Sequence, residues 1–205
     1  MSYTPHPEEH DCTACNLAHH RRQVVFPDGP KDGLLAVGEA PGALEDEQGA
    51  GFVGVAGTNL DRAIEQTLGL DRDEYARANV VRCRPPQNKP PRKEEVEACR
   101  ALLDRAIEQM QPRMIVAVGQ SAARRLLGLP AQEPYLPRIQ DQLMRLEDGE
   151  GVSYAYRGRP LLLMPHTSPL AWNRTYTDER GQTQRIAELG RRVLMMAAPY
   201  LAGAR

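Results

Sequence analysis

The stretch Gly33-Leu-Leu-Ala-Val-Gly-Glu-Ala-Pro-Gly42 decides how this chain folds. Its first part, Gly33 to Gly38, is a short apolar run bounded by glycines, which is typical of a strand buried on both faces. The part after Gly38 is a Gly/Pro-rich loop. In parallel sheets, ligands bind beyond the carboxyl ends of the strands. We therefore expect a binding site directly after Gly38.

Strand and helix patterns alternate along the rest of the chain, which predicts a mostly parallel sheet covered on both faces. The loop at 42–57 carries five glycines, and a loop of this length in a small domain is usually functional. Further strands are expected at 79–82, 114–118 and 161–164, helices at 58–68, 93–110, 120–128 and 183–198, and a hairpin within 143–156. We predict one domain, 1–205: a three-layer α/β sandwich around a central, mostly parallel four-stranded sheet.

Composition limits the possible partners. The 205 residues are 41% hydrophobic, enough for one core, and no apolar run reaches membrane-spanning length, so we expect a soluble cytoplasmic protein. The net charge is −1, so any binding to DNA needs a local basic patch. Two stretches qualify, although each could also be ordinary solvated surface. They are Arg82, Arg84, Lys89, Arg92 and Lys93, and His19, His20, Arg21 and Arg22.

The four cysteines are Cys12, Cys15, Cys83 and Cys99. Disulfides explain them poorly in a reducing cytoplasm, whereas a Cys-x-x-Cys pair lets two thiolates face one metal site. Four thiolates suit tetrahedral zinc or an iron–sulfur cluster, and spacing alone does not separate the two. Cys99, on the apolar face of its expected helix, could alternatively be a core residue.

Three motifs together resemble the family 4 uracil-DNA glycosylases. They are Gly38-Glu-Ala-Pro-Gly-Ala-Leu-Glu-Asp46 with Gly51-Phe-Val-Gly54, then Asn79-Val-Val-Arg-Cys-Arg-Pro-Pro-Gln-Asn88, and His166-Thr-Ser-Pro-Leu170. The cysteine spacing also resembles that family's cluster-binding set. The resemblance implies the uracil-DNA glycosylase fold, removal of uracil from single- and double-stranded DNA in base excision repair, and a [4Fe–4S] cluster on the four cysteines. It also implies an N-terminal cluster-binding segment at about 10–22, and we expect a monomer.

Within this resemblance, the residues have chemistry that suits a flipped base. The Asn79 carboxamide offers a donor and an acceptor that complement O4 and N3–H of uracil. Phe52 can stack on the base, and a His166 hydrogen bond can stabilise charge developing on the departing uracil O2. Each residue also has a structural alternative. Asn79 could be a turn-forming residue, Phe52 could pack the loop against the core, and His166 could be a structural histidine at the end of a strand. The resemblance further implies that main-chain groups of Glu39 and Ala40 hold the pyrimidine and that Glu45 limits access near C5.

The last motif is expected to contact DNA. Ser168, Pro169 and Leu170 would form a wedge, with Leu170 filling the gap left by the flipped nucleotide. Asn88 and Arg174 are expected to contact phosphates.

The chain departs from related sequences at three places. Ala40 stands where the best-known uracil-specific family has an aspartate that orients water, so the group that activates water stays open between Glu39, Asn79 and others. Thr167 replaces a more common proline. No histidine-containing insertion follows the second motif, which favours turnover over covalent trapping.

Two other function classes remain open from the residues. A zinc- or cluster-stabilised DNA-binding module would make no use of a base pocket formed by Phe52, Asn79 and His166. A redox protein is disfavoured because the chain has no Gly-x-Gly-x-x-Gly fingerprint for flavin or nicotinamide.

Overall fold

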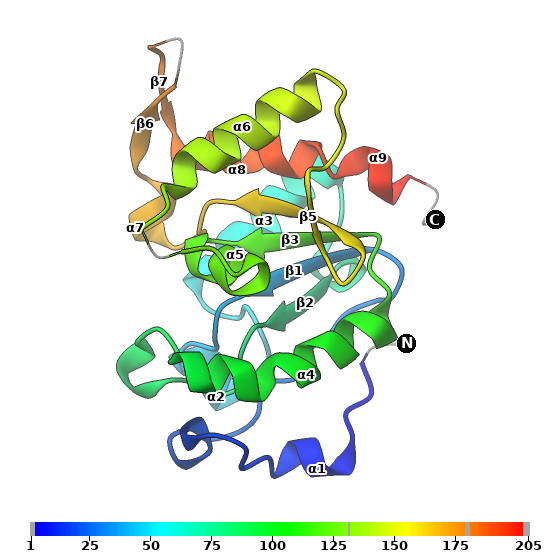
Figure 1. The fold of residues 1–205 in the computed structure, drawn as a ribbon, viewed down its shortest axis with the longest axis vertical. Helices are drawn as coiled ribbons and strands as arrows, with labels where there is room; N and C mark the ends of the chain where they lie inside the picture. The colour runs from blue at the N-terminus through cyan, green and yellow to red at the C-terminus, as the bar shows by residue number, and fades with distance from the viewer. Residues whose placement is uncertain (1–2, 131, 179–180, 203–205) are drawn as a thin grey trace.

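The computed structural model describes residues 3–130, 132–178 and 181–202. At its centre lies a five-stranded sheet in the order β2-β1-β3-β5-β4 (Figure 1). β2, β1, β3 and β5 are parallel, and β4 pairs antiparallel with β5 at the edge. The strands are β1 (Leu34–Gly38), β2 (Ala76–Asn79), β3 (Met114–Val118), β4 (Tyr154–Tyr156) and β5 (Arg159–Met164). The α/β sandwich is confirmed, with one more strand than predicted.

Helical elements make up most of the remaining regular structure. The α-helices are α1 (Pro7–His10), α2 (Ala43–Gln48), α3 (Val55–Leu68), α4 (Lys93–Met110), α5 (Gln120–Leu127), α6 (Tyr135–Glu147), α7 (Pro169–Trp172), α8 (Ile186–Met195) and α9 (Ala198–Leu201). The 3₁₀ turns are η1 (Asn16–His19), η2 (Arg72–Glu74) and η3 (Pro86–Asn88), and a small hairpin joins β6 (Thr175–Thr177) to β7 (Thr183–Arg185). No helix in the described ranges is both long and apolar enough to cross a membrane.

Helices cover both faces of the sheet. Crossovers between parallel strands are right-handed as a rule. From β1 the chain passes outward to β2 at the edge of the sheet, and then returns past β1 to β3. Because these two crossovers run in opposite directions across the sheet, their helices α3 and α4 lie on opposite faces. α8 packs against α3, while α5 packs on β1 and β3, on the face that also carries α4 in Figure 1. α6 contacts β5 and α8. The central strands are therefore buried on both sides, which explains their continuous apolar runs.

Strand register brings four strand ends to one edge of the sheet. Gly38 at the end of β1 pairs with Asn79 at the end of β2, and Val118 of β3 pairs with Met164 of β5. The chain segments that follow these residues all begin at this edge. Residues remote in sequence therefore meet beyond the carboxyl ends of the strands, as the sequence predicts.

The second strand corrects the prediction in a way that matters for the site. We expected it at 79–82, but β2 spans Ala76–Asn79. Arg77 interrupts the apolar pattern by which the strand would be recognised. This residue is nevertheless buried, because its guanidinium pairs with Asp28 at 2.9 Å and lies over the Tyr75 ring. The shift moves Asn79 from the start of the strand to its carboxyl end.

Three helix and hairpin predictions were also wrong at their boundaries. α3 begins at Val55, not Thr58, because Gly54 caps it and the glycine in its first turn weakens the sequence pattern. Residues 143–147 complete α6 instead of opening a hairpin. The hairpin actually joins β4 to β5 through Arg157 and Gly158, both at positive φ, as a two-residue turn with this twist requires. The last predicted helix is shorter, because β7 occupies 183–185.

Candidate active site

A pocket of about 450 Å³ opens beyond the carboxyl ends of β1, β2, β3 and β5. We call it the carboxyl-end pocket. Eight of the predicted site residues line it: Glu39, Ala40, Glu45, Phe52, Asn79, Asn88, His166 and Ser168. Pro169, Leu170 and Arg174 are not among its lining residues. The sheet thus brings together the residues expected to handle a base and leaves part of the expected DNA-contacting set outside.

Gly38 allows two of these side chains to converge. A Cβ at Gly38 would overlap the Asn79 Oδ1 and would lie 2.9 Å from the Phe52 Cζ. Any larger residue here would push the amide or the ring out of place. The absence of a side chain at Gly38 therefore sets the spacing between an aromatic face and a carboxamide on the pocket wall.

Phe52 has a backbone conformation that few non-glycine residues adopt. Its φ is +57°, in the left-handed region. Arg72 holds it there: the guanidinium donates to the carbonyls of Phe52, at 3.0 Å, and Gly51, at 2.7 Å, and pairs with Asp61 at 2.9 Å. Gly57 packs so closely on the Phe52 backbone that a Cβ would overlap the carbonyl. The loop is therefore built to fix the ring, and such strain is usually kept for a functional reason.

The Asn79 residue is 8% exposed and lines the carboxyl-end pocket. Among the described residues, none hydrogen-bonds its side-chain amide, and the amide atoms are not fully buried. Gln142 shows the contrasting case, because its fully buried amide both donates to the Leu163 carbonyl and accepts from the Leu163 N–H. The Asn79 amide is therefore free to hydrogen-bond a ligand that fills the pocket. Asn79 therefore has the properties of a recognition group.

The two carboxylates of the pocket have different roles. Both Glu45 oxygens accept backbone hydrogen bonds, from Gly42 N–H at 3.1 Å and from Gly54 N–H at 2.9 Å, so this side chain closes the loop between α2 and α3. The Glu39 carboxylate lies 3.7 Å from the Arg125 Nε. Burial raises the pKa of Glu39, and Arg125 and Ser121 oppose that shift. Glu45 is thus held by backbone N–H groups, whereas the partners of Glu39 are the side chains of Arg125 and Ser121.

The His166 ring has a defined orientation and tautomer. Its Nδ1 accepts a hydrogen bond from the Ser168 N–H at 3.0 Å, so in the neutral ring the proton resides on Nε2. Part of the residue is exposed to the pocket, yet partial burial lowers the pKa of the imidazole and favours the neutral form. Gly119 lets the ring pack closely, since a Cβ there would lie 2.8 Å from the His166 Cδ2. His166 can therefore present an N–H donor to a ligand.

The segment after His166 is anchored at one residue and projects at another. Thr167 is fully buried; its hydroxyl donates to the Ala56 carbonyl at 2.7 Å, and its carbonyl accepts from Asn59 Nδ2 at 2.8 Å. Leu170, in α7, is 82% exposed, while Trp172 of the same short helix is buried. The replacement of proline by Thr167 thus adds a hydrogen bond to α3, and the structure presents Leu170 as a projecting apolar side chain.

Comparisons with known proteins agree with this geometry. The sequence model of the Uracil DNA glycosylase superfamily matches residues 26–190. A type-4 uracil-DNA glycosylase of Sulfurisphaera tokodaii is 34% identical over 163 residues, which is 78% of this chain and 70% of that protein. One from Pyrobaculum aerophilum is 45% identical over 120 residues, 58% of this chain and 61% of that protein. The chain belongs to the type-4 uracil-DNA glycosylase family.

The four cysteines come from the N-terminal segment, the loop after β2 and α4. Cys83 and Cys99 are buried, Cys12 and Cys15 are partly buried, and the four form no disulfide. The thiols influence one another electrostatically, Cys83 with Cys15 and Cys99, and Cys99 with Cys12 and Cys15. Among the described residues, no three His, Cys, Asp or Glu side chains are grouped tightly enough to hold a metal ion.

The first predicted DNA-binding patch of this type-4 family member needs correction. Arg82 is 2% exposed; it pairs with the buried Glu9, which also accepts from Arg105 at 2.6 Å and from the Tyr3 hydroxyl at 2.5 Å. This network ties the N-terminal segment to α4, so Arg82 has a structural role. The sequence of an irregular segment does not reveal which of its side chains are buried and which are exposed.

Sequence reasoning missed two residues that support the others. Arg72 fixes the Phe52 backbone, and Gly119 admits the His166 ring. Both supports act across long sequence separations, so no local pattern identifies them. The position of Gly119 between a strand and a helix was a weak signal, because such a glycine often allows a close approach of a ligand or side chain. Thr167 was singled out from the sequence, but its hydrogen bond to Ala56 was not.

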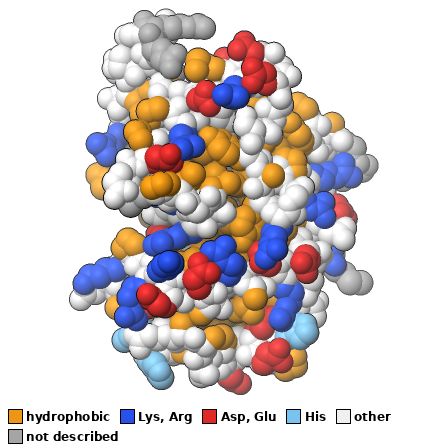
Figure 2. All heavy atoms as spheres, in the orientation of Figure 1, with side chains coloured by type: hydrophobic (Ala, Val, Ile, Leu, Met, Phe, Trp, Pro, Cys, Tyr) orange, Lys and Arg blue, Asp and Glu red, His pale blue; other side chains and the backbone are white. Residues whose placement is uncertain are grey.

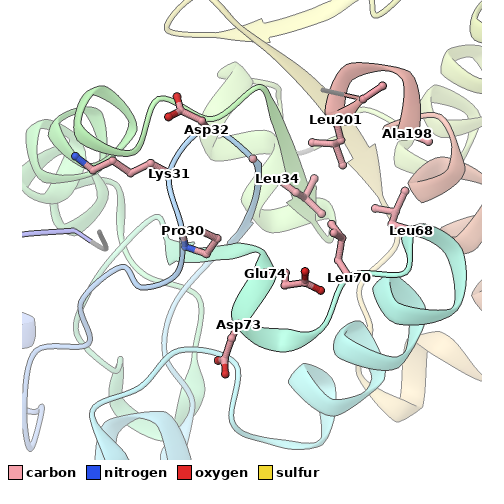
Figure 3. A pocket seen from close by; sticks show the side chains of 12 residues that line it. Pro30, Lys31, Asp32, Leu34, Leu68, Leu70, Asp73, Glu74, Ala198 and Leu201 are labelled. Carbon is pink, nitrogen blue, oxygen red and sulfur yellow. The ribbon is translucent and has the colours of Figure 1, made fainter. Parts of the chain in front are cut away.

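A second cavity of similar size lies at the other end of β1. It encloses about 420 Å³, and its lining includes four leucines and three acidic residues (Figure 3). Leu34, Leu68, Leu70 and Leu201 form its apolar part. We call it the amino-end pocket.

Proposed function

We propose that this protein hydrolyses the N-glycosidic bond of deoxyuridine flipped out of DNA, releasing uracil and leaving an abasic site. The observation that carries the proposal is the Asn79 carboxamide, which lines the pocket beside Phe52 and His166 and which no described residue hydrogen-bonds. Uracil offers O4 as an acceptor and N3–H as a donor, which match the amide; cytosine offers the reverse pattern and leaves the amide unpaired. The activity of the related type-4 enzymes supports the same assignment.

The chemistry follows from where charge develops. When the bond between C1′ and N1 breaks, its electron pair leaves with uracil and spreads onto O2. The Nε2–H of neutral His166 is the donor we assign to that oxygen, and a hydrogen bond that strengthens as charge grows lowers the barrier. Water adds to C1′ and loses a proton. Because both Glu45 oxygens are occupied by backbone N–H groups, we assign Glu39 to orient this water or accept its proton.

DNA contacts complete the proposal. We assign Leu170 as the apolar wedge, because an exposed leucine anchored between Thr167 and Trp172 can enter the base stack without being pushed aside. Asn88 lines the pocket and accepts from Arg84 Nε at 2.8 Å, which positions both near a flanking phosphate. Ser168, Pro169 and Arg174 are assigned to the same DNA-facing edge. Action on both single- and double-stranded DNA, a single domain over 1–205, a monomeric state and a cytoplasmic location stay predictions.

We further propose that Cys12, Cys15, Cys83 and Cys99 hold a [4Fe–4S] cluster. Burial raises the pKa of the Cys83 thiol to about 12, so its thiolate needs a bound cationic centre. The support for a cluster is the spacing of the four cysteines together with membership of the type-4 family. When bound, the cluster would supply structural cross-linking between the segment at about 10–22, the loop after β2, and α4.

The activity test uses labelled oligonucleotides that contain one uracil, single- or double-stranded, followed by alkali. We expect strand scission at the uracil and release of free uracil, with none from matched thymine or cytosine substrates. Tight binding without any abasic sites under enzyme excess would favour a non-catalytic DNA-binding module instead.

The cluster test is separate. Anaerobically purified protein should be brown, absorb near ~400 nm and contain iron and sulfide. Stoichiometric zinc without iron would contradict the cluster while leaving the activity assignment in place.

A further inference from the structure

A further cavity adjoins the carboxyl-end pocket between α4 and α5. It encloses about 420 Å³, and Glu39 lines both this cavity and the pocket. The connecting chain is also continuous, since Lys89 lines the pocket and Pro90 lines the cavity. We call this cavity the α4–α5 groove. The pocket and the groove are therefore neighbours that share a wall at Glu39.

Basic side chains dominate the walls of the α4–α5 groove. Lys93, Arg100, Arg124 and Arg125 line it, against the carboxylates of Glu39 and Glu97. Figure 2 shows Lys and Arg side chains gathered along the band between α5 and α4. Because the whole chain carries a net charge of −1, this gathering is a local feature and not a general excess of positive charge.

Among the described residues, two of these cations form no close ion pair. Arg100 pairs with Glu97 at 2.6 Å, and Arg125 lies 3.7 Å from Glu39. Lys93 acts on Glu97 only at longer range, and Arg124 hydrogen-bonds neutral groups, the Glu133 carbonyl at 2.9 Å and the Gln120 amide. Within the described ranges, no carboxylate lies at ion-pair distance from Lys93 or Arg124. The groove therefore keeps positive charge that a polyanion can neutralise.

We propose that the α4–α5 groove binds the phosphate backbone of the single DNA strand that continues from the flipped nucleotide. The proposal rests on the proposed function, which places a nucleotide in the adjoining pocket. None of the described lining residues is aromatic, so the groove has no platform for stacking bases and is suited to phosphates. A strand extends from the pocket in two directions, and the groove leads in one of them. Its contribution must therefore depend on the polarity of the flanking DNA.

The test measures binding of single-stranded oligonucleotides that carry a non-cleavable deoxyuridine analogue at one end. One oligonucleotide extends only on the 5′ side of the analogue and the other only on the 3′ side. Lys93→Glu is the main variant, because Lys93 is exposed at the first residue of α4, where an acidic residue favours the helix. Lys31→Glu is the matched control: the same charge change, also on an exposed lysine, at the amino-end pocket.

We expect Lys93→Glu to weaken binding of one extended oligonucleotide by about tenfold and to leave the other within about twofold. The slope of log K against log salt for the affected oligonucleotide should become shallower by roughly 0.7 for each phosphate that the variant no longer neutralises. Arg124→Gln should reduce affinity for the same polarity. Lys31→Glu should change neither.

An equal loss for both polarities, or an equal loss in Lys31→Glu, would overturn the proposal, because it would indicate a general charge effect. Unchanged binding in both Lys93→Glu and Arg124→Gln would also overturn it. Either result, obtained with wild-type protein that cleaves uracil-containing DNA, would leave the proposed function intact. Failure of the wild type to cleave would remove both.

Discussion

The two ends of β1 carry pockets of nearly equal volume and different chemistry. The carboxyl-end pocket encloses about 450 Å³ and the amino-end pocket about 420 Å³. The first contains the Asn79 carboxamide and an oriented His166, whereas the second is lined by four leucines together with charged residues such as Asp32 and Asp73 (Figure 3). The charged residues of the amino-end pocket are exposed, while Asn79 is only 8% exposed and His166 is fixed by a hydrogen bond. Volume therefore does not distinguish the two pockets, but polar side chains held in a confined, oriented position do.

The largest expected effect tests the recognition group. Asn79→Asp replaces a donor and acceptor by a carboxylate that only accepts and that repels uracil O4. We expect the single-turnover rate on uracil to fall by about 10⁴-fold, the size typical of a mismatched hydrogen-bonding site, with a trace of activity gained on cytosine. Asp73→Asn makes the reverse exchange at the amino-end pocket and should leave the rate within about threefold. Unchanged uracil cleavage by Asn79→Asp would remove Asn79 from recognition.

The next effect tests the leaving-group donor. His166→Ala removes the Nε2–H that we assign to uracil O2, so the cleavage rate should drop by about 10²–10³-fold while binding to DNA with a non-cleavable analogue changes little. Single-turnover kinetics under enzyme excess and a binding titration measure the two quantities. The exposed His6 gives a control, His6→Ala, which should behave as wild type. If His166→Ala lost rate and affinity equally, His166 would be a positioning residue.

The pH dependence of the rate sharpens the assignment of both titratable groups. Burial lowers the pKa of His166 from its ordinary 6.5 and raises the pKa of Glu39 from 4.5. The neutral imidazole and the ionised carboxylate therefore coexist above these shifted values. We expect a flat single-turnover rate near neutral pH and a fall of about tenfold per pH unit once the more basic of the two groups is protonated.

The His166→Gln variant should keep only the acid limb that belongs to Glu39. An acid limb that begins above pH 6.5 in the wild type and is lost in His166→Gln would contradict the lowered pKa of His166.

The smallest expected effect tests the anchor of the DNA-facing loop. Thr167→Val keeps the shape and removes the hydroxyl hydrogen bond to the Ala56 carbonyl, which should cost about 0.5–1.5 kcal/mol and slow cleavage by about three- to tenfold. Thr67→Val removes a similar bond, to the Ala63 carbonyl at 2.6 Å, near the far end of α3. Thermal unfolding should shift similarly in both variants, and only Thr167→Val should slow cleavage. An equal rate in the two variants would leave Thr167 with a purely structural role.

Much of the fold was readable from local pattern. The buried strands at 34–38 and 114–118 and the helix at 93–110 match the predictions closely, because continuous apolar runs and a sustained helical period are strong signals. The predictions failed where tertiary contacts override the local pattern. Arg77 enters a strand because Asp28 and Tyr75 satisfy it, and the β4–β5 hairpin turns at Arg157-Gly158 although Asp148-Gly149 has the more typical turn sequence.

The sequence by itself singled out Phe52, Asn79 and His166 by residue type and by motif, and the structure shows that all three line the carboxyl-end pocket. Only the tertiary structure decided how they are held. Strand register placed Asn79 beside Gly38, Arg72 fixed the Phe52 ring, and the Ser168 N–H selected the tautomer of His166. It also decided that Arg82 is buried and that Lys93 and Arg124 share a groove. The physical reason is that burial and partner choice depend on contacts between residues far apart in the chain, which no local pattern encodes.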